Sequence, residues 1–91
     1  MNNLSASFKL MLANVRVRIL ERSETFRGQA VGPFTFALHL LQTLQETDFA
    51  ILEAFEAAVG QDEVTKWYQD VLAEMGATFG ADEPISNSGA A

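Results

Sequence analysis

Cysteine is absent from this 91-residue chain. Its absence excludes disulfide bonds, thiolate metal sites and cysteine nucleophiles, and it fits a reducing compartment. Long apolar runs are also missing, because the longest one, residues 33–41, is far shorter than the ~20 residues that a membrane-spanning helix needs. The N-terminal residues contain no apolar run of the kind found in signal peptides. We therefore expect a cytoplasmic protein that does not contact a membrane.

The sequence also lacks a constellation of residues that would support catalysis or metal binding. His39 is the single histidine, and the nearest carboxylate that could orient it on a helix, Glu46, lies two helical turns away. Glu53 and Glu56 are three residues apart, but no Glu-x-x-His or His-x-x-x-His pattern accompanies them. Residues 28–32 lack the Gly-Lys-Ser/Thr ending of a phosphate loop. We therefore predict no catalytic residue, no metal ligand and no cofactor, and we expect that the protein is not an enzyme.

Basic residues are few and unevenly distributed. The chain has six Lys and Arg against twelve Asp and Glu, for a net charge of −6. Residues 1–31 hold five cations against two carboxylates, a balance of +3, whereas residues 32–91 hold one cation against ten carboxylates, a balance of −9. The nearest counter-charges for the N-terminal arginines are thus in the same chain. We expect these arginines to pair mainly within the molecule and to leave only part of their charge exposed.

The residues that are abundant indicate one small globular domain. Hydrophobic residues make up 48% of the chain and charged residues 20%, which is the composition of a folded protein. We expect a single helical domain over residues 1–76, followed by a flexible tail over residues 77–91, where small and polar residues are interrupted by Gly and Pro. Because so small a core gives limited stability, self-association would be a natural supplement.

The clearest helical pattern covers residues 62–75. Apolar side chains recur there with the 3.6-residue period of a helix, at Val64, Trp67, Tyr68, Val71, Leu72 and Met75. Asp62 is placed to cap the start of this helix, and Gly76 is placed to end it.

Residues 33–46 also follow a helical pattern, beginning with a proline that suits a first helical position. One apolar stripe consists of Phe34, Ala37, Leu38, Leu41 and Leu44, and a second contains Phe36 and Leu40. Because two sides are apolar, we expect this helix to be central. If it continued, it would place Asp48 in the core, where a lone carboxylate is costly. We therefore predict a break near Thr47–Asp48, with one of the two capping a further helix over 49–59. The alternative is one helix over 33–59 with Asp48 in water.

The opening stretch fits a helix over about residues 4–22. This helix would gather one apolar face from Leu4, Phe8, Met11, Leu12, Val15 and Ile19 and would leave Leu10, Val17 and Leu20 outside it. The β-branched residues at 15, 17 and 19 favour an alternative, a β-hairpin of residues 8–12 and 15–20. We predict a mostly α fold, a bundle of three to four helices at about 4–22, 33–46, 49–59 and 62–75. The alternative fold is an N-terminal β-hairpin followed by helices.

For function, the sequence favours a protein–protein interaction module. We expect an adaptor, inhibitor or assembly chaperone of the kind that phages encode, acting as a homodimer through an apolar helical face rimmed by arginines. The candidate partner-binding residues are Arg16, Arg18, Arg22, Phe26, Arg27, Trp67 and Tyr68, the last two because aromatic side chains often anchor interfaces. The alternative is a small nucleic-acid-associated regulator that uses the arginine cluster on phosphates. No small-molecule substrate is evident.

Overall fold

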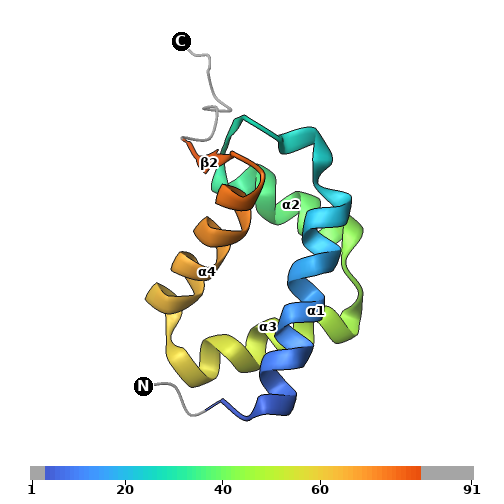
Figure 1. Ribbon diagram of the computed structural model, residues 1–91, viewed down its shortest axis with the longest axis vertical. Coiled ribbons are helices and arrows are strands. Elements are labelled where there is room, and N and C mark those ends of the chain that lie inside the picture. The colour runs from blue at the N-terminus through green and yellow to red at the C-terminus, as the bar shows by residue number, and fades with distance from the viewer. Residues whose placement is uncertain (1–3, 81–91) are drawn as a thin grey trace.

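The computed structural model describes residues 4–80, and these residues form a small bundle of helices, as predicted (Figure 1). The elements in chain order are α1 (Ala6–Arg22), a 3₁₀ turn (Glu24–Phe26), β1 (Ala30–Val31), α2 (Pro33–Thr43), α3 (Glu46–Val59), α4 (Gln61–Glu74) and β2 (Thr78–Phe79). None of the helices within residues 4–80 is long and apolar enough to cross a membrane.

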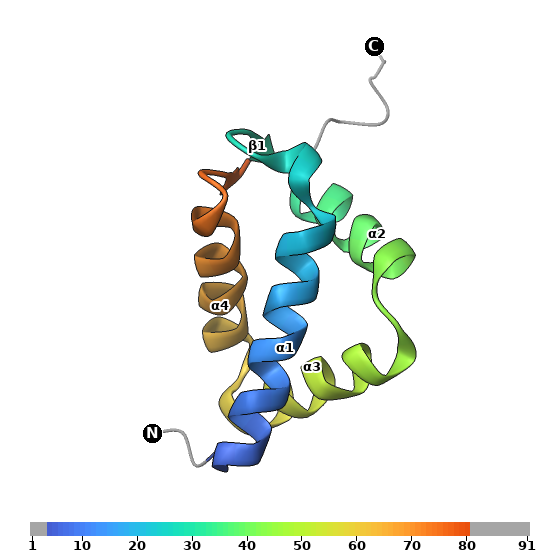
Figure 2. The same cartoon turned by 45° about the vertical axis from the view of Figure 1, so that its right-hand side comes forward.

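Residues 6–22 form one helix rather than a hairpin. The hydroxyl of Ser5 caps its start by accepting a hydrogen bond from the backbone N–H of Phe8 at 3.0 Å. Leu12, Val15 and Ile19 are buried on one face, and this face packs against α3 and α4. The gain from burying a continuous apolar face outweighs the β preference of the branched side chains, because propensity is the weaker term. Figure 2 shows α1 in front of the other helices.

The break between α2 and α3 lies at Leu44–Gln45, three residues before the predicted position. Gln45 is the N-cap of α3, and it forms a reciprocal capping box with Asp48. The prediction that Thr47 or Asp48 would be the N-cap is wrong, because both lie inside α3 and Asp48 contributes to the cap from its first turn. The alternative that Asp48 faces water is also wrong, since Asp48 is 1% exposed. The error came from treating this carboxylate as a lone charge, whereas Arg18 of α1 pairs with it.

A single glycine joins α3 to α4. Gly60 adopts φ 92° and ψ 162°, a backbone conformation that is essentially restricted to glycine. Asp62 was predicted as the N-cap of α4, but it lies in the first turn of this helix together with Glu63. The positive end of the helix dipole stabilises carboxylates at these positions. Gly76 ends the helix with φ 69°, as predicted. Two backbone hydrogen bonds close that end, from Gly76 N–H to the Ala73 carbonyl and from Ala77 N–H to the Leu72 carbonyl.

The packed structure continues beyond residue 76, where the tail was expected to begin. Ala77 is 1% exposed, and β2 pairs in parallel with β1, with Ala30 opposite Thr78 and Val31 opposite Phe79. The connector between α1 and α2 thus supplies the strand that pairs with residues 78 and 79. These residues are far apart in the chain, so local composition does not reveal the pairing. The rest of the predicted tail, residues 81–91, lies outside the described residues.

The core lies between α1, α3 and α4, with α2 attached beside α1. Its buried apolar residues are Leu12, Val15, Ile19, Val31, Phe36, Leu40, Leu44, Leu52, Phe55, Val64, Val71, Leu72, Met75 and Ala77. The prediction that α2 is central is wrong, because only one of its two apolar stripes is buried. Phe36 and Leu40 are buried, but Phe34, Leu38 and Leu41 are exposed.

Candidate functional site

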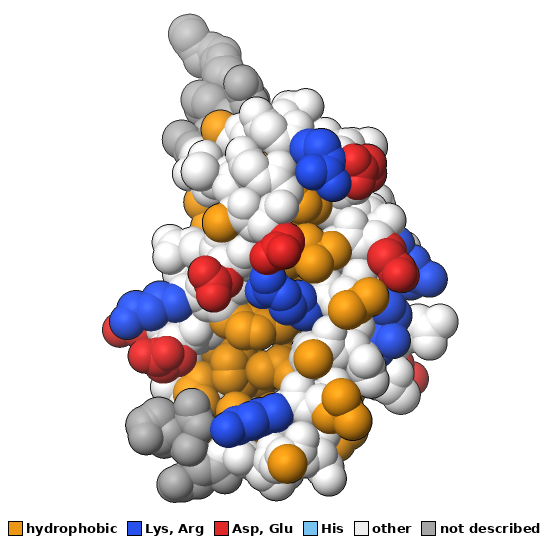
Figure 3. Space-filling model, viewed as in Figure 1, with side chains coloured by type: hydrophobic (Ala, Val, Ile, Leu, Met, Phe, Trp, Pro, Cys, Tyr) orange, Lys and Arg blue, Asp and Glu red, His pale blue; other side chains and the backbone are white. Residues whose placement is uncertain are grey.

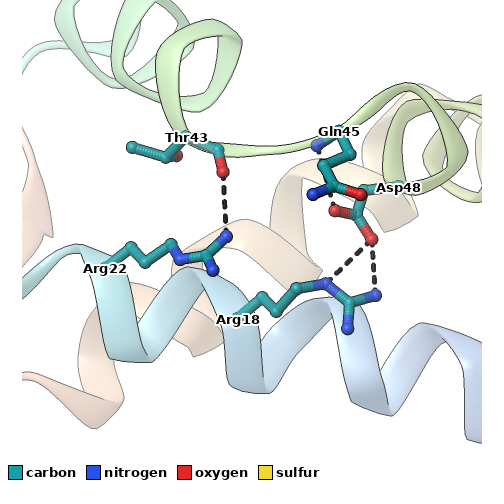
Figure 4. Close-up of polar contacts among 5 residues, drawn as sticks. All are labelled: Arg18, Arg22, Thr43, Gln45 and Asp48. Atoms are coloured by element: carbon teal, nitrogen blue, oxygen red, sulfur yellow. Dashed lines mark hydrogen bonds and ion pairs between the residues drawn. The ribbon is translucent and has the colours of Figure 1, made fainter.

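The arginines on α1 bind acidic and carbonyl groups of the same chain. Arg18 donates from Nε to Oδ1 of Asp48 at 3.0 Å, and its Nη2 contacts the same oxygen. The other carboxylate oxygen of Asp48 accepts a hydrogen bond from the backbone N–H of Gln45 at 3.1 Å. One turn along α1, Arg22 donates from Nη1 to the carbonyl oxygen of Thr43 at 3.1 Å. Figure 4 shows both arginines reaching from α1 to the α2–α3 junction. The arginines therefore fasten this junction to α1.

The environment of Asp48 stabilises its charged form. Burial alone would raise the pKa of the carboxyl, but the hydrogen bonds from Arg18 and from the backbone of Gln45, together with the positive charges of Arg18 and Arg22, outweigh it. The pKa of Asp48 consequently lies below its ordinary value. The carboxyl is held in its ionised form and is engaged on both oxygens, which makes it a structural group rather than a proton donor.

Arg16 and Arg27 also have partners within the chain. Arg16 donates to Glu74 near the end of α4 at 2.6 Å, and Arg27 pairs with Glu24 three residues before it. The prediction that the N-terminal arginines pair mainly within the molecule is thus confirmed for Arg16 and Arg18. The face that these arginines rim is the inner face of α1, which α3 and α4 cover.

The three aromatic candidates lie partly buried at the edge of the core. The ring of Phe26 stands edge-on to His39 at 4.8 Å between centroids and to Phe36 at 6.1 Å. Trp67 stands edge-on to Tyr68 at 5.2 Å. Burial, with a smaller effect from the charge of Glu56, raises the pKa of Tyr68 to about 12.

His39 on α2 is half-buried. Its Nε2 lies 2.9 Å from the hydroxyl oxygen of Ser23. A serine beside a histidine is one part of a nucleophilic site, but Ser23 is fully buried and a substrate cannot reach it. Within residues 4–80, no group of three or more His, Asp or Glu side chains is arranged to hold a metal ion.

A groove of about 580 Å³ lies between α2 and α4. Its apolar walls come from Phe36, Ala37 and Leu40 of α2, Tyr68 of α4 and Phe79 of β2. The remaining lining residues are Pro33, Gln61, Thr65 and Gln69, so no charged side chain lines the groove.

Of the seven candidate partner-binding residues, only Tyr68 lines this groove. Elsewhere, Trp67 lines a smaller hollow of about 250 Å³ with Phe55, Glu63, Lys66 and Asp70. Figure 3 shows charged side chains of both signs around an apolar area between α4 and α1.

Two helices carry large apolar side chains on their outer faces. On α2, Phe34 is 57% exposed, Leu38 43% and Leu41 65%. On α1, Leu10 is 65% exposed and Val17 49%. None of these five was among the predicted partner-binding residues. The sequence carried a signal for both faces, namely a second apolar stripe on each helix, but periodicity alone does not say which stripe a helix buries.

Comparisons with protein-family models, with curated proteins and with solved structures found no match to this chain. The geometry of the site is therefore the basis for the function proposed below.

Proposed function

We propose that this protein is a protein–protein interaction module whose docking surface is the outer face of α2 together with the groove beside it. The observation that carries the proposal is the exposure of Phe34, Leu38 and Leu41, spaced i, i+4 and i+7, on a helix without Asp, Glu, Lys or Arg. Residues at this spacing lie on one side of a helix. Apolar surface of this kind on a small protein marks a place where a partner can be bound.

The outer face of α2 is continuous with the groove. Ala37 lines the groove, and helical geometry places it on α2 between buried Leu40 and exposed Leu41. A partner that covers Leu38 and Leu41 therefore reaches the apolar wall of the groove as well. Gln61, Thr65 and Gln69 on the α4 side offer amide and hydroxyl groups rather than charges.

This chemistry suits an uncharged, apolar partner segment. An amphipathic helix fits best, since it can place its own i, i+3 and i+4 side chains into such a groove. A module of this kind serves as an adaptor, an inhibitor or an assembly chaperone. The predicted arginines have a different part in this proposal, because Arg16 and Arg18 secure the scaffold through Glu74 and Asp48. Their ion pairs also weigh against the alternative of a nucleic-acid regulator.

The test is affinity capture from the source cells with quantitative mass spectrometry, followed by cross-link mapping on the partner that is found. We expect Leu38→Ser combined with Leu41→Ser to weaken binding at least about a hundredfold, because each buried leucine contributes about 1.5–3 kcal/mol. Glu53→Ser is the matched control, since Glu53 is exposed on α3. Binding should change little with salt. A partner retained by the leucine variant, or one released by moderate salt as nucleic acid would be, contradicts the proposal.

A further inference from the structure

Apolar residues on the outer face of α1 recur with the spacing that is found in two-helix interfaces. Ala6, Leu10, Ala13, Val17 and Leu20 are separated alternately by four and three positions, which is the spacing of the contact positions in paired helices. Ala6, Leu10, Ala13 and Val17 are exposed, and Leu20 is half-buried. This stripe lies on the opposite side of α1 from Leu12, Val15 and Ile19, which are buried in the core. The helix is thus folded and held in place by its inner face while its outer face stays open.

We infer that this outer stripe pairs α1 with α1 of a second copy of the chain, in a parallel arrangement. Small Ala6 and Ala13 alternate with larger Leu10 and Val17 along the stripe, so the two helices can approach closely. A β-branched residue such as Val17 followed three positions later by leucine favours a two-helix pairing in parallel. The stripe is distinct from the docking surface on α2, so this inference does not rest on the proposed function.

The charged residues beside the stripe favour a second copy of the chain as the partner, and they favour a parallel over an antiparallel arrangement of the two helices. Lys9 and Arg16 follow one edge, and Asn14 and Glu21 follow the other. In a parallel pair, a residue on the first edge meets the residue five positions later on the second edge of the partner helix. Arg16 then meets Glu21 of the partner subunit, and the twofold symmetry makes this contact twice. An antiparallel pair would instead bring Lys9 opposite Arg16 of the partner subunit, where like charges repel.

The internal partner of Arg16 is compatible with this contact. Its Nη2 donates to Glu74, and a guanidinium carries five N–H donors in a planar fork. The side chain of Arg16 is 28% exposed, and Glu21, on the other edge of the stripe, is exposed. One arginine can therefore bridge Glu74 of its own chain and Glu21 of the partner subunit.

Sedimentation equilibrium of the full chain, from about 1 µM to about 1 mM, tests self-association. The wild type should show a reversible monomer–dimer equilibrium. Leu10→Ser combined with Val17→Ser should weaken it at least about tenfold and leave the helical circular dichroism spectrum unchanged, because both side chains are exposed. The matched control, Leu38→Ser with Leu41→Ser, should dimerise like the wild type. A wild type that stays monomeric throughout, or an α1 variant that dimerises normally, overturns the inference.

Direction is tested by cross-linking, which the absence of cysteine makes simple. In a parallel pair Ala6 of one subunit lies beside Ala6 of the other, so Ala6→Cys alone should form a disulfide-linked dimer on mild oxidation. Introducing Leu10→Ser and Val17→Ser into that variant should slow the cross-linking. If linked dimers form only when Ala6→Cys is mixed with Leu20→Cys, the helices run antiparallel and the inference is wrong.

Discussion

At the scale of single residues, Asp48 shows how a carboxylate that is costly to bury can stabilise the fold when both of its oxygens have partners. Its side chain is 2% exposed, and a buried carboxylate without partners would be strongly destabilising. Arg18 satisfies one oxygen, and the backbone of Gln45 satisfies the other. The same carboxylate thereby caps α3 and ties it to α1. The exposed pair Arg27–Glu24 lies on the surface within one turn and contributes little, because solvent screens it.

This arrangement predicts a specific acid sensitivity. The pKa of Asp48 is lowered in the folded protein from an ordinary value of 3.8, so the unfolded chain takes up the proton first as pH falls. Stability from this group is therefore complete above about pH 5 and is lost as pH falls through the lowered pKa. Urea unfolding of wild type and Asp48→Asn at pH 7, 5, 4 and 3 measures it.

Asp48→Asn should be less stable than the wild type at pH 7, and the difference should shrink at pH 3. Glu53→Gln, on the exposed side of α3, is the control and should change neither value. A constant difference between wild type and Asp48→Asn across this range would contradict the assignment.

At the scale of elements, the short connections between helices determine how the helices are arranged more than the helices themselves do. Gly60 turns the chain from α3 into α4 within one residue, at φ 92°. An added Cβ there would meet no atom within 4 Å. The requirement for glycine is thus one of backbone conformation alone, and not of space.

Gly60→Ala should lower the free energy of unfolding by about 1–3 kcal/mol, the strain of a non-glycine residue in this region. Chemical denaturation measures the change. A chemically synthesised chain with D-alanine at this position is the matched control, because D-alanine favours positive φ, and it should be at least as stable as the wild type. Equal destabilisation by both forms of alanine would point to packing instead.

At the scale of the whole molecule, the connector between α1 and α2 meets the segment that follows α4. The connector between α1 and α2 donates from Gly28 N–H to the carbonyl of Met75 at 3.0 Å, and β1 pairs with β2 just beyond α4. These contacts close the bundle at one end and extend the domain to residue 79. Figure 1 shows β2 directly after α4, beside the start of α2.

This closure predicts where the chain can be shortened. A chain ending at Gly76 should be less stable than one ending at Gly80, because it loses buried Ala77 and the half-buried ring of Phe79. We expect a loss of about 2–3 kcal/mol from apolar burial alone. Thermal and urea unfolding of the two truncated chains, each compared with the full chain, measure it. Equal stability of the two truncated chains would show that β2 is dispensable.

The positions of the helices and the pairing of charge followed largely from local patterns. The 3.6-residue repeat over residues 62–75, the stop at Gly76 and the excess of cations before residue 32 were all readable in the sequence, because each depends on neighbouring residues or on net charge. They correctly predicted a helical bundle whose Arg16 and Arg18 pair with acidic residues of later helices.

Only the tertiary structure decided which stripe of each helix is covered. On α2 it buried Phe36 and Leu40 and left Leu38 and Leu41 exposed, although both stripes are equally apolar. It also placed Asp48 against Arg18, 30 residues away. The amino-acid sequence by itself determines where apolar side chains repeat. Which repeat is buried depends on the helices that pack beside it, and that is a property of contacts between residues far apart in the chain.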